Sequence, residues 1–87
     1  TIETAYTIMN GEYEVIEAEI IETSELINKE LKNSNLPDEI RIGAVLRENK
    51  IIIPRSNFVF LKDDKVVFLA KKDSISVVEN IFRISSI

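Results

Sequence analysis

The sequence predicts an α+β fold, a small and mostly antiparallel sheet of about four strands with two helices. The predicted order is β-α-β-β-β-α, preceded by a short N-terminal extended arm. Apolar and polar residues alternate in two stretches and one further run is continuously apolar, which is typical of half-buried and fully buried strands. Two other stretches carry apolar residues at helical spacing after a residue that can cap a helix. Three strands in succession favour antiparallel pairing.

The chain begins with an arm and a strand. Residues Ala5 to Met9 can form a short extended segment, and Asn10-Gly11 is a strong turn signal. From Tyr13 onward, apolar residues alternate with glutamates at the two-residue period of a half-buried strand. The apolar residues of this strand are Ile16, Ala18 and Ile20.

A short amphipathic helix is predicted from Glu25 to Lys32. Ser24 can act as its N-cap, and Glu25 places a negative charge in the first turn, where it suits the helix dipole. The apolar residues at helical spacing are Leu26, Ile27 and Leu31. Asn33 to Pro37 then has the composition of a loop.

The next strand is predicted over Ile40 to Arg47. One of its faces is expected to carry Ile40, Ile42, Ala44 and Leu46. Glu48-Asn49-Lys50 offers a tight turn into a strand over Ile51 to Ile53. Pro54 ends that strand, because proline cannot donate to a ladder.

The run Val66 to Ala70 is continuously apolar, so we expect it to be the central and most buried strand. It follows a brief apolar segment, Phe58 to Leu61, and a polar turn. Asp73 or Ser74 is expected to cap a final helix. The apolar face of this helix carries Ile75, Val78, Ile81 and Phe82. The short tail after it, with Ile84 and Ile87, is expected to dock on another subunit, and a frayed terminus is the alternative.

Composition excludes several classes of protein. Length fits one domain, and a net charge of −4 with scattered basic pairs argues against nucleic-acid binding. The chain has no Cys and no His, so disulfides, thiolate metal sites and the commonest general base are absent. No apolar run is long enough to insert in a membrane, and no secretory signal is visible. Because it begins at Thr1 without Met, we expect an excised fragment of a longer chain.

Two glutamates on one strand face form a candidate metal site. Glu17 and Glu19 have Cα atoms roughly 7 Å apart and could bind Ca²⁺ or Mg²⁺ through oxygen ligands. A solvated strand face is the alternative, and for exposed glutamates it is the more common one. A pair of catalytic carboxylates is a weaker alternative, since no leaving-group binder is evident.

A ligand site is predicted where strand ends and loops gather polar and apolar groups. Its residues are Leu36, Arg41, Pro54 and Ser56. Arg41 and Arg55 could hold a phosphate or carboxylate through two hydrogen bonds each, although ordinary surface arginines are the more common case. The serines lack a histidine to activate them and the glycine motifs that bind phosphate are absent, so neither an enzyme nor a dinucleotide-binding fold is expected.

The order and spacing of short motifs resemble one family. These motifs are Glu14-Val-Ile-Glu-Ala-Glu, Glu22-Thr-Ser, Leu26-Ile, Leu36-Pro, Ile42-Gly-Ala-Val-Leu-Arg, Ile53-Pro-Arg, Asp64 with Val66 to Leu69, and Val78-Glu-Asn-Ile-Phe-Arg. Together they resemble the TrkA C-terminal (RCK C) domain, most of all the last such domain of Trk-type potassium-uptake regulators. The resemblance implies an arm or linker over residues 1–12 and this domain over residues 13–87.

The resemblance also implies a function. Such domains belong to cytoplasmic regulators, peripheral to the inner face of the cell membrane, that act on a membrane potassium-translocating subunit. They typically form homodimers and are not enzymes. NAD or ATP/ADP would bind a separate N-terminal domain, so no cofactor is expected in this fragment. In some relatives the dimer groove binds cyclic di-AMP; the matching positions lie around Leu36, Arg41, Pro54 and Ser56, but the loop before Ile42 departs from those relatives.

Two other classes of function remain open at this point. The chain could be a ligand-binding or interaction module fused to an unrelated transporter or transcription regulator. It could also be an enzyme, which the absence of His and Cys disfavours.

Overall fold

The computed structural model describes residues 2–82, so the prediction that the tail with Ile84 and Ile87 docks on another subunit lies outside the described residues. Within them, five strands form one sheet in the order β1-β2-β5-β3-β4, and every neighbouring pair is antiparallel. The elements are β1 (Ile2–Ile8), β2 (Tyr13–Glu19), β3 (Ile40–Arg47), β4 (Lys50–Ile52), β5 (Lys65–Lys71) and the helix α1 (Ile75–Phe82). The predicted α+β class and antiparallel pairing are confirmed, although the sheet has one strand more than expected.

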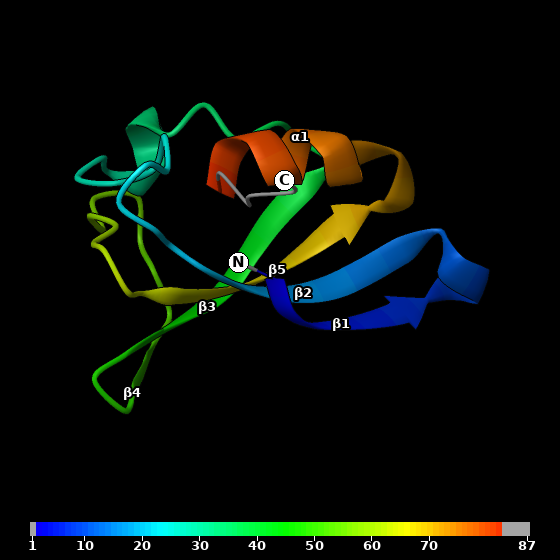
Figure 1. The fold of residues 1–87 in the computed structure, drawn as a ribbon, viewed down its shortest axis with the longest axis horizontal. Coiled ribbons are helices and arrows are strands. Elements are labelled where there is room, and N and C mark those ends of the chain that lie inside the picture. The colour runs from blue at the N-terminus through cyan, green and yellow to red at the C-terminus, as the bar shows by residue number, and fades with distance from the viewer. Residues whose placement is uncertain (1, 83–87) are drawn as a thin grey trace.

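The helix α1 lies over one face of the sheet, and the long loops gather at one end of it (Figure 1). The core fills the space between α1 and the sheet. There the rings of Phe68 and Phe82 stack nearly parallel, with centroids 5.0 Å apart and planes 6° apart. The predicted apolar face of α1 is confirmed, since Val78, Ile81 and Phe82 are buried.

The helix begins differently from the prediction. A 3₁₀ turn over Lys72–Ser74 runs directly into α1, so Asp73 and Ser74 lie inside the helical segment. The residue before that turn is Lys71, which makes no side-chain capping hydrogen bond. Neither predicted cap is therefore correct.

The N-terminal arm is a full edge strand. β1 pairs with β2 along its length, which raises the strand number from about four to five. The Asn10-Gly11 turn explains this pairing, because both residues take positive φ angles (57° and 88°) and reverse the chain tightly. That residues 1–12 also lead from a preceding domain stays a prediction.

The helix predicted over Glu25 to Lys32 is wrong. The chain instead forms turns, an isolated bridge between Glu30 and Val59, and a 3₁₀ turn over Leu31–Asn33. Asn28 has a φ of 62°, which interrupts a right-handed helix. Short turn bonds remain, such as the one from the Lys29 amide to Leu26, but others go to residues 56–60: the Asn28 amide donates to Phe60 and the Phe60 amide to Lys29.

Ser24 serves the other helix. Its hydroxyl donates to the carbonyl of Ile81 (2.9 Å) and accepts from the amide of Leu26 (3.1 Å). Because Ile81 is in the last turn of α1, its carbonyl has no partner within the helix. Ser24 therefore anchors the end of α1 rather than the start of a helix of its own.

A bulge changes the face that β3 presents. The register with β5 shifts between Ile42 and Ala44, where Gly43 adds one residue. As a result Ile40 and Val45 are buried beneath α1, whereas Ala44 and Leu46 face the opposite side. The prediction that Ile40, Ile42, Ala44 and Leu46 share one face is therefore wrong.

The central position of β5 is confirmed. It lies between β2 and β3, and Val66, Phe68 and Ala70 are buried under α1. The intervening Val67 and Leu69 are only half-buried, because they lie on the face of the sheet away from the helix.

Candidate functional site

A hollow of about 360 Å³ lies where residues 31–38 meet the beginning of β3. Residues 31–38 begin with the 3₁₀ turn over Leu31–Asn33, and Asn35 then reverses the chain with a φ of 56°. The amide of Lys32 donates to the carbonyl of Ser56 (2.9 Å), which ties this loop to the segment after β4. One side of the hollow is therefore formed by β3, and the other by a loop that backbone bonds hold in place.

Two cationic side chains border this hollow. Lys32 and Arg41 belong to its lining, together with the polar Asn35 and the apolar Leu36 and Pro37. Lys32 lies 3.9 Å from Glu30, a loose contact between two exposed groups that leaves it accessible to a ligand. Cations beside apolar side chains suit an anionic ligand that also has an apolar part.

The structure brings together only some of the residues that the sequence predicted for ligand binding. Leu36 and Arg41 line the same hollow, but Pro54 and Ser56 are not part of its lining. Ser56 is connected to the hollow indirectly, because its carbonyl accepts the amide of Lys32, which is a lining residue. The assignment of these four residues to a ligand stays a prediction.

Sequence reasoning missed Lys32 and Asn35. Lys32 was placed at the end of a helix, where it would have been an ordinary surface residue. The signal that could have identified Lys32 is its position directly before the loop sequence Asn33-Ser34-Asn35, nine residues from Arg41. A basic residue at the start of a polar loop is a candidate anion ligand.

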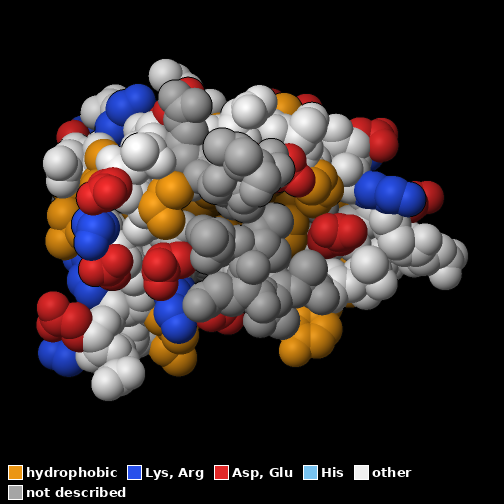
Figure 2. Space-filling model, viewed as in Figure 1, with side chains coloured by type: hydrophobic (Ala, Val, Ile, Leu, Met, Phe, Trp, Pro, Cys, Tyr) orange, Lys and Arg blue, Asp and Glu red, His pale blue; other side chains and the backbone are white. Residues whose placement is uncertain are grey.

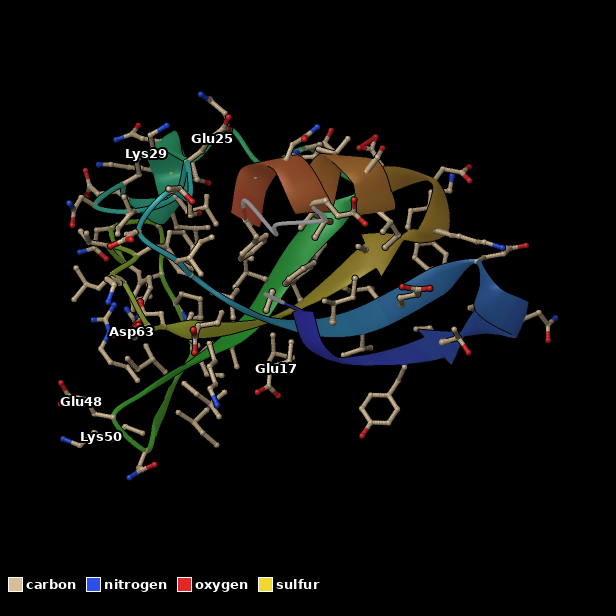
Figure 3. The ribbon with its side chains drawn as sticks, viewed as in Figure 1. Glu17, Glu25, Lys29, Glu48, Lys50 and Asp63 are labelled. Carbon is tan, nitrogen blue, oxygen red and sulfur yellow. The ribbon has the colours of Figure 1, made fainter. Side chains whose placement is uncertain are left out.

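The predicted acidic pair lies elsewhere. Glu17 and Glu19 sit on β2, opposite Val67 and Lys65 of β5, and Figure 3 shows Glu17 projecting away from α1. Among residues 2–82, no cluster of three or more Asp or Glu side chains is positioned to hold a metal ion. Since Ca²⁺ takes six to eight oxygen ligands, this pair would need other groups to complete a site, and the metal assignment stays a prediction.

A second polar cluster has a structural role. Arg47 and Asp64 form an ion pair beneath the loop end of the sheet, and the guanidinium lies 4.8 Å from the centre of the Phe58 ring. The pKa of Arg47 is raised, chiefly by its hydrogen bonds to Asp64; attraction to Asp64 and Glu48 adds to this, while burial opposes it. Both oxygens of the Asp64 carboxylate already accept hydrogen bonds, from Arg47 and from the amide of Leu61. Asp64 therefore has little capacity to bind a ligand.

Comparison with known proteins identifies the family. The model of the TrkA-C domain matches residues 15–83. This chain belongs to the TrkA-C domain family. The match spans the sheet from β2 onward together with α1, so the family assignment covers the hollow and the ion pair alike.

The relatives of this TrkA-C domain are potassium-uptake proteins by name. A Trk system potassium uptake protein TrkA of Azorhizobium caulinodans is 38% identical over 97% of the chain. The TrkA homolog of Archaeoglobus fulgidus is 36% identical over 74% of the chain, and the TrkA of Haemophilus influenzae is 29% identical over 98%.

The chain spans less than a fifth of the length of these relatives: 18%, 15% and 19% respectively. Their names thus describe proteins that contain much more than this domain. Within residues 2–82, no helix is both long enough and apolar enough to cross a membrane.

Proposed function

We propose that this TrkA-C domain is a regulatory, non-catalytic part of a Trk-type potassium uptake system. It acts in the cytoplasm at the inner face of the membrane, where it associates with the membrane potassium-translocating subunit. The observation that carries the proposal is the family match over residues 15–83, with relatives that are named as Trk potassium uptake proteins. None of the relatives described above has an enzymatic name.

We further propose that the domain pairs with a second copy and senses a small anionic ligand. The hollow beside Lys32 and Arg41 supports the ligand, since it offers two cations next to the apolar Leu36 and Pro37. A nucleotide has this combination of phosphate and apolar base. The cyclic dinucleotide implied by the family resemblance is one member of that class, whereas NAD and ATP or ADP would bind a separate domain.

Such a domain would regulate transport by linkage. A ligand that binds one arrangement of the pair more tightly than another shifts the population toward the first, by no more than its difference in affinity. The loop over residues 31–38 suits this role, because it lies outside the sheet and its backbone bonds run to residues 56–58 and within the loop, so a change in its conformation need not break a strand pairing.

Thermal-shift measurements test ligand sensing directly. The chain would be screened against cyclic di-AMP, ATP, ADP, NAD, Ca²⁺ and Mg²⁺. A binder present at about 100 times its dissociation constant should add about 2.7 kcal/mol to the free energy of unfolding. Arg41→Ala should reduce the shift, and Arg55→Ala, an exposed arginine outside the hollow, is the matched control. The sensing proposal fails if no nucleotide shifts the transition, or if both variants respond alike.

Rubidium uptake by cells tests the transport role. Arg41→Ala placed in the chromosomal gene should alter the rate or the regulation of uptake, and Arg55→Ala should leave both unchanged. Uptake that is the same in both variants, and also in a strain lacking the gene, would favour the alternative that this domain serves an unrelated transporter or transcription regulator.

A further inference from the structure

The two edges of the sheet are built differently. β4, at one edge, has only three residues, begins with Lys50 and is followed closely by Pro54. A short strand, a lysine and a proline are features that keep an edge from pairing with another chain. β1, at the other edge, has seven residues and contains no Lys, Arg or Pro. Within residues 2–82 nothing pairs with its outer side, which leaves a long edge open (Figure 1).

The hydrogen bonds of β2 show which way its backbone groups point. At one end, the carbonyl of Glu12 accepts the amide of Lys72, which directly follows β5 (2.9 Å). At the other end, the amide of Ile20 donates to the carbonyl of Asp64, which directly precedes β5 (2.8 Å). Because backbone groups point to alternate sides along an antiparallel strand, the even-numbered residues of β2 bond toward β5 and the odd-numbered ones toward β1.

The free backbone groups of β1 follow from this alternation. Tyr6 is the partner of the odd-numbered Val15, so the amide and carbonyl of Tyr6 point inward to β2. The amides and carbonyls of Ala5 and Thr7 therefore point outward. These two residues offer donors and acceptors along the open edge, in the arrangement that receives an added strand.

The hairpin formed by β1 and β2 is acidic. Residues 2–19 contain no Lys or Arg but five glutamates: Glu3, Glu12, Glu14, Glu17 and Glu19. Lys65 of the neighbouring strand β5 is opposite Glu19. Glu14, in contrast, is opposite Ala70 of β5 and Thr7 of β1, and no ion pair among residues 2–82 involves it. A segment added to β1 therefore meets unpaired negative charge.

We propose that the outer edge of β1 docks an extended basic segment of the membrane potassium-translocating subunit, which joins the sheet as a further strand. The inference rests on the association with that subunit proposed above and names the surface that makes it. The cytoplasmic loops of membrane proteins carry an excess of Lys and Arg, so their charge complements that of the hairpin. The hairpin of a second copy would instead place like charges side by side.

The two faces of the edge select different side chains on the docked segment. Thr7 lies beside Glu14 on the face that α1 covers, and a long Lys or Arg side chain of the added strand can reach across it to the carboxylate. On the opposite face, Tyr6 and Ile8 are 67% and 42% exposed. Figure 2 shows hydrophobic surface protruding where β1 runs. Basic and apolar residues should therefore alternate in the docked segment.

Proline at position 7 tests the backbone pairing. Thr7→Pro removes the outward amide and leaves the bonds between β1 and β2 in place, whereas Thr7→Val keeps the amide and is the matched control. Biolayer interferometry with the full-length protein and the detergent-solubilised membrane subunit measures the dissociation constant. This constant should rise about ten-fold for Thr7→Pro and stay unchanged for Thr7→Val.

Charge reversal tests the electrostatic part of the contact. Glu14→Lys should raise the dissociation constant about five-fold, and added salt should reduce this difference. Glu79→Lys, at an exposed position of α1, is the matched control and should leave the constant unchanged. Circular dichroism checks that every variant remains folded; if Thr7→Pro unfolds, the two charge variants decide.

The outcomes separate this inference from the proposed association. Wild-type protein that does not bind the membrane subunit overturns both. Binding in which each variant matches its control overturns the docking edge and leaves the association intact. If Thr7→Pro changes the size of the protein's own assembly in light scattering but not its binding, the edge pairs copies of the chain and the inference is wrong. Weaker binding of Thr7→Pro and Glu14→Lys than of their controls supports both.

Discussion

Arg47 and Asp64 form a two-pronged ion pair that ties the end of β3 to the turn before β5. Nε of Arg47 donates to Oδ1 of Asp64 at 2.7 Å, and Nη2 donates to Oδ2 at 2.6 Å. Asp64 is 1% exposed, and its Oδ2 also accepts the amide of Leu61 at 2.8 Å. Nη2 of Arg47 reaches the carbonyl of Val59 as well. The pair therefore organises the whole loop from residue 58 to residue 64.

Removing the arginine should be costly. We expect Arg47→Met to lower the free energy of unfolding by about 3 kcal/mol, because it leaves the buried carboxylate of Asp64 without its counter-charge. Arg47→Lys should recover only part of this loss, since lysine has the charge but not the planar fork. Urea denaturation measures both. A loss no larger than that of Arg55→Met, at an exposed arginine, would contradict the structural role.

The ion pair should be insensitive to alkaline pH. Because the folded state raises the pKa of Arg47, its contribution is fully present below the unfolded-state pKa, which already lies far above neutral pH, and is lost only above the folded value. The difference in unfolding free energy between wild type and Arg47→Met should therefore stay constant from about pH 7 to about pH 10. Denaturation at several pH values tests this, and a difference that shrinks steadily across that range would show another group to be responsible.

Ser24 should matter through the end of α1. Ser24→Ala removes the donor to the Ile81 carbonyl and the acceptor for the Leu26 amide, both of which are buried. We expect a loss of about 1–3 kcal/mol in unfolding free energy, because the buried amide of Leu26 loses its acceptor and the carbonyl of Ile81 keeps only its bond from the Glu25 amide. Hydrogen exchange should become faster in the last turn of α1. Ser56→Ala, at an exposed serine, should change neither quantity.

The turn between β3 and β4 can be improved. Glu48 and Asn49 take φ angles of 50° and 63°, the left-handed region that favours glycine. Asn49→Gly should raise the free energy of unfolding by about 0.5–1 kcal/mol, because two-residue hairpins of this kind prefer Asn-Gly. Asn57→Gly is the control, since Asn57 is not at positive φ and should lose stability instead. A drop in the denaturation midpoint of Asn49→Gly would refute the turn geometry.

Patterns local to one strand were predictable from the sequence. The alternation from Tyr13 fixes which residues of β2 face the core, because a strand turns each side chain to the opposite face from the last. The apolar run at residues 66–70 likewise identifies β5 as central. The spacing of Val78, Ile81 and Phe82 identifies the buried face of α1 for the same kind of reason.

The missed features depend on contacts between distant segments. Helical spacing at Leu26, Ile27 and Leu31 was overridden because this stretch bonds to residues 56–60, thirty residues further along. The bulge at Gly43 reverses the faces of β3, which no pattern of period two can reveal. The sequence predicted Leu36 and Arg41 as part of the candidate site but not Lys32. The position of Lys32 at the hollow depends on the backbone bond from its amide to the distant Ser56.

The sequence alone therefore determined the class of fold, the central strand, the final helix and the family, because these follow from local periodicity and from the order of short motifs. Tertiary structure decided that the arm is a strand, that Ser24 holds the end of α1 and that, within residues 2–82, nothing covers the second face of the sheet. These features depend on which elements meet in space: β1 finds β2 across a tight turn, Ser24 meets a carbonyl 57 residues away, and α1 packs on one face of the sheet. The periodicity of side chains within one segment does not show which other segment it will contact.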